Sequence, residues 1–338
     1  MNKMFDYKSY PILYIDDEKG NLLAFENCFD KDFKIITALS AEEGLELVKE
    51  NESIALVVTD QKLGHGKMEG TTLCELIQKE YPSIIRIILT AYKEFDIALN
   101  SINTGNIYKY ICKPYDPDAV RMDLQRAIDL YILIDERKKI TIQIINSLIK
   151  ALEAKDRYTS GHSEAVTKYA SWIVKKLMEK NFGEEIDEPT FLQDIQTAGR
   201  LHDIGKIGVV ESILNKPGKL TDEEYAEIKK HPITGANILT LVEDLQKYIP
   251  FVLHHHERWD GKGYPDELKG EDIPLGSRIL SVADTYDAMT SCRSYRKGFP
   301  PEKAAQELIA CKGSQFDPVM VDAFIEVLID EGIIKKIN

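Results

Sequence analysis

The stretch IALVVTD, residues 54–60, is a run of apolar residues that ends in an acid. An apolar run of this length is typical of a strand that is buried on both faces of a parallel sheet. Four similar runs accompany it, and segments with helical apolar spacing separate them. These runs are PILYID (11–16), FKIITA (33–38), IIRIILTA (84–91) and IYKYICKP (107–114). The alternation predicts a doubly wound α/β domain with five parallel strands.

Polar residues stand at the carboxyl ends of four of these strands. Asp16 and Asp17 end the first, Asp60 the third, Thr90 the fourth and Lys113 the fifth. Because the carboxyl ends of parallel strands meet at one edge of the sheet, we expect the five side chains to converge. Three carboxylates suit Mg²⁺, which prefers oxygen ligands. With Lys113, the metal would neutralise a phosphoryl group on Asp60, so the pattern indicates nucleophilic catalysis that forms an acyl phosphate.

These residues resemble the receiver domain of bacterial response regulators over about residues 9–127. The matching motifs are DD (16–17), VVTDQKLG (57–64), LTA (89–91) and KYICKPY (109–115). The resemblance implies a flavodoxin-like fold, Asp60 as phosphoacceptor and a cognate sensor histidine kinase as partner. It also implies Mg²⁺ bound by Asp16, Asp17 and Asp60, and a switch formed by Thr90, Tyr110 and Lys113. One departure is the loop DQKLGHGKMEG (60–70), which is longer than the family's D-x-x-M-P turn and lacks its proline.

Residues 118–155 contain no glycine or proline and carry an apolar stripe at helical spacing. One interpretation is a single connecting helix that pairs with a second copy of the chain, which would make a homodimer. The other is two helices joined by a short break at DERKK (135–139). We place the receiver at residues 9–127, a connecting helix at 128–150 and a second domain at 151–338.

After residue 158 the strand signals stop, and the second half is predicted to be all-α. Six segments show helical apolar spacing. They are residues 162–180, 191–203, 221–243, 245–257, 276–291 and 301–312.

Six of the seven histidines follow residue 160, and acids lie beside several of them. Neutral imidazole and carboxylate groups together suit a first-row transition metal. We expect His202 and Asp203 to be adjacent on a helix, so that their side chains diverge and the acid reaches a second metal. Asp284 lies on an apolar helix, where an unpaired carboxylate would be costly. Taken singly, His162 could be a core residue and HHHE (254–257) a surface cluster. Together, the pattern indicates a dinuclear hydrolase, in which two metals about 4 Å apart act on a phosphorus ester.

Four motifs then resemble the HD-GYP family over about residues 145–338: HDIGKIG (202–208), KKHP (229–232), HHERWDGKGYP (255–265) and SVADTYDAMTSCRSYRK (281–297). The resemblance implies an HD-type helical domain that hydrolyses cyclic di-GMP to pGpG or GMP. The implied metal ligands are His162, His202, Asp203, His231, His255, His256 and Asp284. Asp203 and Lys206 would be catalytic, and Lys206, Arg293 and Arg296 would hold substrate phosphate. Gly263, Tyr264 and Pro265 would shape the site and offer a contact for a partner such as a diguanylate cyclase.

Some members of that family bind a third metal through a Glu one turn before the first His. Tyr158 stands at that position here, so two metals are expected, although Glu153 and Asp156 lie near in the sequence. Nitrogen and oxygen donors fit Fe or Mn, and also Ni, Co or Zn.

Composition and charge exclude some classes of function. The 43 basic and 56 acidic residues give a net charge of −13, and no basic recognition helix is evident, which argues against DNA binding. Five scattered cysteines without a CxxC pair indicate reduced thiols, and no apolar run is long enough for a membrane span, so we expect a cytoplasmic protein. Two hypotheses remain: a phosphorylation-controlled phosphodiesterase, or an adaptor that binds nucleotide or protein through the GYP loop without turnover.

Overall fold

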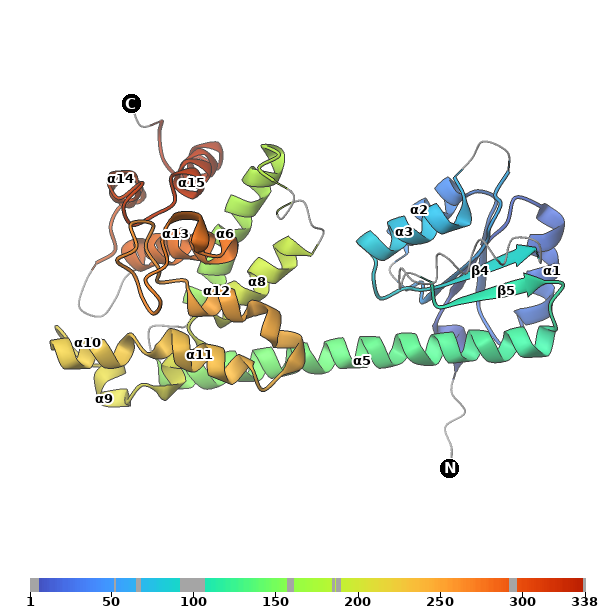
Figure 1. Cartoon of the computed structure of the whole chain (residues 1–338), viewed down its shortest axis with the longest axis horizontal. Helices are drawn as coiled ribbons and strands as arrows, with labels where there is room; N and C mark the ends of the chain where they lie inside the picture. Colours follow the sequence, from blue (N-terminus) through green and yellow to red (C-terminus); the bar gives the residue numbers. More distant parts are fainter. Residues whose placement is uncertain are drawn as a thin grey trace. The chain divides into compact units, whose positions relative to one another are not determined.

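The structure is a computed structural model that describes residues 6–51, 53–64, 68–91, 107–156, 161–183, 186, 190–291 and 297–336 (Figure 1). The chain divides into two compact units, residues 1–140 and residues 141–338. The helical spacing of KEFDIALNSINTG (93–105) also predicts a helix before the fifth strand, but this segment lies outside the described residues. Among the described helices, none combines the length and the apolar composition that crossing a bilayer requires.

The first unit contains a five-stranded sheet in which every neighbouring pair of strands is parallel, in the order β2-β1-β3-β4-β5. Each strand falls within one of the five apolar runs. The strands are β1 (Ile12–Ile15), β2 (Ile35–Ala38), β3 (Leu56–Asp60), β4 (Ile85–Ala91) and β5 (Lys109–Lys113). The predicted doubly wound parallel fold is confirmed.

Alternating side chains of the strands supply two apolar layers, one on each face of the sheet. On one face, Tyr14 and Val58 pack with α1 (Lys19–Phe29) and the first part of α5 (Pro117–Lys155). On the other face, Leu13 and Val57 pack with α2 (Ala41–Glu50) and α3 (Gly70–Glu80). Figure 1 shows α2 and α3 on the side of the sheet opposite to α5. Helices therefore cover both faces and leave the carboxyl edge of the strands open for a site.

The helix α5 shows that residues 118–155 form one helix rather than two. It is one continuous helix of 39 residues that begins in the first unit and ends in the second, without a break at 135–139. Its last part is anchored to the second unit, where Ile145 and Leu152 are buried and the Thr141 hydroxyl donates to Asp244 at 2.9 Å.

The second unit is helical, as predicted. Its helices are α6 (His162–Glu179), α8 (Phe191–Leu201), α9 (Glu211–Leu214), α10 (Asp222–Ile228), α11 (His231–Leu239), α12 (Ile249–Leu253), α13 (Leu275–Thr290), α14 (Pro301–Ala310) and α15 (Pro318–Asp330). Short 3₁₀ helices lie at Tyr7–Ser9 in the first unit and at Ile204–Gly208, Glu243–Tyr248 and Gly270–Asp272 in the second. A single apolar core joins α6, α8, α13, α14 and α15.

Three predicted helical segments are wrong in detail. Residues 221–243 form two helices, α10 and α11, because Pro232 has no N–H to continue a helix but fits the first turn of a new one. His202 and Asp203 lie just after α8 rather than on a helix, and the three histidines at 254–256 follow the end of α12. Helix α15 was not among the predicted segments, although Asp317 and Pro318 are typical of a helix start.

Candidate functional site

At the carboxyl edge of the sheet, one lysine bridges two carboxylates. The Lys113 Nζ at the end of β5 lies 3.1 Å from an Asp16 oxygen and 3.0 Å from an Asp60 oxygen. Asp16 follows β1 and Asp60 ends β3, its neighbour in the sheet. The parallel arrangement of the strands thus brings together three residues that the sequence places at different strand ends.

Asp16 is completely buried and is held by three donors besides Lys113. The Tyr14 hydroxyl donates to it at 2.7 Å, the Asn21 amide at 2.9 Å and the Glu18 N–H at 3.0 Å. Burial raises the pKa of Asp16, but the hydrogen bonds from Tyr14 and Asn21 outweigh burial, so that pKa lies below its ordinary value. Burial raises the pKa of Asp60, although Lys113 opposes this. These oxygen donors at one sheet edge fit a hard cation such as Mg²⁺.

The other residues predicted at this edge differ in their burial. Thr90 is buried in β4, where its hydroxyl donates to the Ala91 carbonyl at 3.4 Å, and Tyr110 is buried in β5. Asp17 is exposed just after β1. Of the departing loop, residues 61–64 and 68–70 are described. A Cβ on Gly70 would lie 2.3 Å from the Asp60 carbonyl oxygen, so the chain returns close behind Asp60 and requires glycine there.

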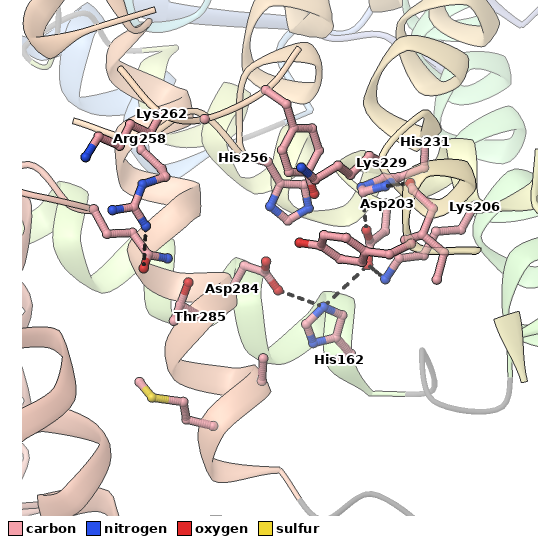
Figure 2. A pocket seen from close by; sticks show the side chains of 17 residues that line it. His162, Asp203, Lys206, Lys229, His231, His256, Arg258, Lys262, Asp284 and Thr285 are labelled. Atoms are coloured by element: carbon pink, nitrogen blue, oxygen red, sulfur yellow. Dashed lines mark hydrogen bonds and ion pairs between the residues drawn. The ribbon is translucent and has the colours of Figure 1, made fainter. Parts of the chain in front are cut away.

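In the second unit, five chain segments carry the imidazoles and carboxylates toward one point. His162 begins α6, His202 and Asp203 follow α8, His231 begins α11, His255 and His256 follow α12, and Asp284 lies within α13. Most of these residues stand at helix ends, so packing of the helices decides whether they meet. Figure 2 shows His162, Asp203, His231, His256 and Asp284 facing one another.

Asp203 lies at the centre of this cluster. Its Oδ1 is 3.3 Å from the His231 Nε2, and its Oδ2 is 3.4 Å from the His202 Nε2. The same Oδ2 is 3.6 Å from the His162 Nε2 and 2.6 Å from the Lys206 Nζ. Burial raises the pKa of Asp203, but Lys206 and His202 outweigh it and hold that pKa well below its ordinary value. Asp203 is therefore an anion in contact with three imidazoles.

Backbone carbonyls fix the orientation of three imidazoles. The Nδ1 of His202 lies 2.7 Å from the Gly199 oxygen, that of His231 lies 2.7 Å from the Ile228 oxygen, and that of His255 lies 2.6 Å from the Val252 oxygen. Because a carbonyl only accepts, each Nδ1 carries the proton and each Nε2 presents a lone pair to the cluster.

Two of these Nε2 lone pairs, on His231 and His255, face each other. The Nε2 atoms of His231 and His255 are 3.3 Å apart, and the His202 Nε2 is buried with no hydrogen-bond partner in the described part of the chain. Two lone pairs that face each other at this distance repel, and an orphaned buried acceptor is costly. A cation bound between them removes both costs, so the donor set fits a metal site.

The cluster has donors for more than one ion. Ligand atoms of His231, His255 and His256 lie within 4.8 Å of one another, as do those of His162, His202 and Asp284. A third group within the same distance contains His202, Asp203 and His255. Because the first two groups share no residue, and Asp203 lies between them, the donors suffice for two ions.

A second carboxylate on α13 orients His162. The His162 Nδ1 lies 2.6 Å from Asp287, while its Nε2 lies 3.2 Å from Asp284. Burial lowers the pKa of His162, but Asp203, Asp284 and Asp287 outweigh burial and raise it to about 11. Three carboxylates that attract a proton so strongly at this point attract a metal cation there for the same reason.

A cavity of about 630 Å³ opens over the cluster. Gly263 and Tyr264 of the GYP loop line it, together with Lys206, and the Tyr264 ring stacks on His256 with centroids 4.9 Å apart. His202 and His255 lie below its floor and are completely buried. Burial and His231 lower the pKa of His256 to about 3, so its imidazole is neutral at neutral pH. The volume is within the range of small-ligand sites.

Some predicted or considered residues lie outside the described residues or outside the cluster. Arg293 and Arg296 lie outside the described residues, as does Tyr158. Pro265 follows Tyr264 in the GYP loop through a cis peptide bond. Glu153 pairs with Lys150 at 3.0 Å, whereas Asp156 is buried at the end of α5 and its charge raises the pKa of Lys206.

Sequence reasoning missed several residues of the cavity wall and one behind it. Tyr225, Lys229, Arg258 and Lys262 line the cavity, and Asp287 orients His162. Their signals were available but weak. Lys229 and Arg258 stand inside motifs that were recognised, and Asp287 follows Asp284 by one helical turn. His254, in contrast, takes no part in the cluster and pairs with Asp266 at 2.9 Å.

Comparison with known protein families gives two matches. Residues 145–320 match a family described as an HD domain. Residues 12–125 match the response regulator receiver domain.

Among curated proteins, the chain is 32% identical over 322 residues to the "Cyclic di-GMP phosphodiesterase" of Thermotoga maritima, which covers 87% of this chain and 84% of that protein. It is 38% identical over 194 residues to the "Cyclic di-GMP phosphodiesterase response regulator RpfG" of Xanthomonas campestris, covering 57% of this chain and 48% of that protein. It is 35% identical over 201 residues to the "3′3′-cGAMP-specific phosphodiesterase 2" of Vibrio cholerae, covering 59% of this chain and 36% of that protein.

Proposed function

The chain belongs to the HD domain family and is a response regulator with an N-terminal receiver domain, and on this premise we propose that it is a phosphorylation-controlled, metal-dependent cyclic di-GMP phosphodiesterase. The products would be pGpG, GMP or both. The observation that carries the proposal is the convergence of imidazole lone pairs on the Asp203 carboxylate, beneath a cavity that can hold a nucleotide.

Two divalent ions are the proposed cofactors of the helical domain. The residues that would hold them are His162, His202, Asp203, His231, His255, His256 and Asp284. Ions bound there would supply Lewis acidity to a phosphodiester and would lower the pKa of bound water toward neutral pH. Fe and Mn are the proposed ions, and the same nitrogen and oxygen donors also bind Ni, Co and Zn.

The remaining residues of the site act on the substrate. Lys206 is held by Asp203 at 2.6 Å and lines the cavity, so its ammonium group would neutralise charge on the phosphate that is cleaved. Tyr264 offers a ring face next to His256, on which a guanine base would stack, and Gly263 and Pro265 shape its loop. Arg293 and Arg296 remain proposed phosphate ligands, on the sequence resemblance alone.

In the receiver, Asp60 is the proposed phosphoacceptor. Asp16, Asp17 and Asp60 would hold Mg²⁺, Lys113 would pair with the phosphoryl group, and Thr90 and Tyr110 would change position with phosphorylation. The donor of the phosphoryl group would be a sensor histidine kinase. The boundaries at 9–127, 128–150 and 151–338, a cytoplasmic location, homodimer formation and a diguanylate cyclase contact stay predictions.

The test is an activity assay with the full chain, purified anaerobically and loaded with Fe or Mn. Cyclic di-GMP and 3′3′-cGAMP are supplied in parallel, and products are separated by chromatography while bound metal is quantified. We expect pGpG or GMP from cyclic di-GMP, and loss of the product after chelation. Tight binding of cyclic di-GMP without product would instead favour the adaptor hypothesis, and turnover of 3′3′-cGAMP alone would reassign the substrate.

A further inference from the structure

The cavity wall carries four cations, and three of them are close to a carboxylate. Lys206 pairs with Asp203 at 2.6 Å. Arg258 pairs with Asp260 through two nitrogens, at 2.8 and 3.0 Å. Lys262 lies near the same Asp260, whose pKa Arg258 and Lys262 both lower. Ion pairing therefore largely compensates the charges of Lys206 and Arg258, and Lys262 shares the Asp260 carboxylate with Arg258.

Lys229 is the fourth cation, and its surroundings are aromatic. Its Nζ lies 5.1 Å from the centre of the Tyr225 ring and 5.0 Å from the centre of the Tyr264 ring. Within the described ranges, Lys229 forms no ion pair. A ring face attracts an ammonium group without neutralising it. Lys229 thus presents an uncompensated positive charge at the cavity.

The local fold holds Lys229 in this place. Lys229 caps the end of α10, one helical turn after Tyr225, so both side chains lie on the same face of the helix. A capping box of Thr221 and Glu224 fixes the start of α10, and Lys216 pairs with Glu224 at 2.6 Å. Tyr264 is fixed in turn by its stacking on His256. In Figure 2, Lys229 lies on the same side of His256 as Lys206, whereas Arg258 and Lys262 lie on the other.

Given the proposed function, the position of Lys229 bears on the class of substrate that the cavity binds. A cyclic dinucleotide carries two phosphodiesters, and only one can be cleaved at the metal cluster at a time. The second phosphate enters the cavity with a full negative charge that needs a partner. We infer that Lys229 binds this second phosphate, and that Tyr225 and Tyr264 hold its ammonium group for that contact. Lys229 is therefore a specificity residue for dinucleotides over substrates with one phosphate.

The experiment compares two substrates on the metal-loaded full chain. Cyclic di-GMP has two phosphates, and bis(p-nitrophenyl) phosphate has one. We expect Lys229→Gln to lose about tenfold more in kcat/KM with cyclic di-GMP than with the small ester, mainly through KM, because a charged hydrogen bond to phosphate is lost. Lys229→Arg restores the preference, since its charge reaches the same rings.

Lys230→Gln is the matched control. Lys230 is the next residue, but it pairs with Glu227 at 2.6 Å and does not line the cavity, so its loss should alter neither substrate. An equal effect of Lys229→Gln on both substrates, or no effect on either, would overturn the inference and leave the phosphodiesterase proposal intact. Wild-type protein that neither binds nor hydrolyses cyclic di-GMP would overturn the phosphodiesterase proposal itself, and the inference with it.

Discussion

At the scale of single residues, the candidate metal site depends on where three protons are held. The backbone oxygens of Gly199, Ile228 and Val252 each accept from an imidazole Nδ1. These carbonyls turn three Nε2 lone pairs inward before any ion arrives. The site is thus preorganised by main-chain atoms, which no substitution of a single ligand would remove.

Asp203 is the residue whose loss should matter most. In Asp203→Asn, the carboxylate that contacts three imidazoles and Lys206 becomes neutral. We expect less than one bound metal per chain and a fall in turnover of about 100-fold or more, because charged ligands dominate such sites. Elemental analysis of the purified protein and a cyclic di-GMP assay provide the measurement. Circular dichroism checks that the helices remain, and full activity at normal metal content would refute the assignment.

Asp287 contacts the His162 Nδ1, not the Nε2 that faces the cluster. Its substitution therefore tests whether the orientation of His162 matters. Asp287→Ala removes the carboxylate 2.6 Å from the His162 Nδ1, so His162 loses its fixed orientation. We expect metal affinity or activity to fall by about 10- to 100-fold in Asp287→Ala. Asp287→Asn should lie between wild type and Asp287→Ala. Metal titration of the chelated protein measures the affinity.

The matched control for Asp287 is Asp266→Ala. It also removes a histidine partner, since Asp266 lies 2.9 Å from the His254 Nε2, but this pair stands outside the cluster. We expect wild-type metal affinity there. Equal losses in both variants would mean that histidine–carboxylate pairs act through general stability rather than through the orientation of His162.

At the scale of elements, the site depends on two segments that approach more closely than side chains allow. A Cβ on Gly205, in the 3₁₀ helix after Asp203, would lie 1.8 Å from the His231 carbonyl oxygen and 2.4 Å from the Gly235 nitrogen. The turn that carries Asp203 and Lys206 therefore packs directly on the backbone of α11. This contact sets the distance between Asp203 and His231.

Gly205→Ala should push these two segments apart. We expect a loss of about 1–3 kcal/mol in unfolding free energy, the usual effect of overpacking, together with weaker metal binding. Thermal unfolding with and without added Mn measures both. Gly208→Ala is the milder comparison, because its nearest neighbour is a Thr234 methyl group at 3.0 Å. An unfolding free energy of Gly205→Ala equal to that of wild type would contradict this prediction, because it would show that α11 shifts without cost.

At the scale of the whole molecule, α5 is the one described element that belongs to both units. Its far end reaches the turn that carries Lys206: Lys155 donates to the Ile207 carbonyl, and Asn215 donates to the Lys155 carbonyl at 2.8 Å. A change in α5 that begins in the receiver therefore has a covalent and hydrogen-bonded route to the turn that carries Lys206.

Asp60→Asn tests this coupling. The variant should keep its hydrolytic activity but lose any response to acetyl phosphate, because the amide cannot form the acyl phosphate. Activity is measured before and after incubation with the phosphodonor. Asp30→Asn, an exposed acid at the end of α1, should respond as wild type does. A persistent response in Asp60→Asn would place the phosphoacceptor elsewhere.

The sequence alone determined the architecture of both halves. IALVVTD and its four companion runs predicted the five strands, because burial on both faces leaves a continuous apolar run. The residues at the strand ends, and the histidines with their neighbouring acids, identified the two candidate sites by residue type and order. Such features depend only on residue type and order, so the sequence alone reveals them.

Only the tertiary structure decided which side chains meet and in which state. Long-range packing pairs His162 with Asp287, brings Tyr264 to Lys229 and leaves His254 outside the cluster. The Nδ1 contacts, in contrast, are local, because each reaches a carbonyl three residues earlier. The break before His231 is likewise a local feature, because Pro232 cannot continue a helix but fits the first turn of a new one. Distances between separate helices are set by how their surfaces pack, and no local pattern encodes them.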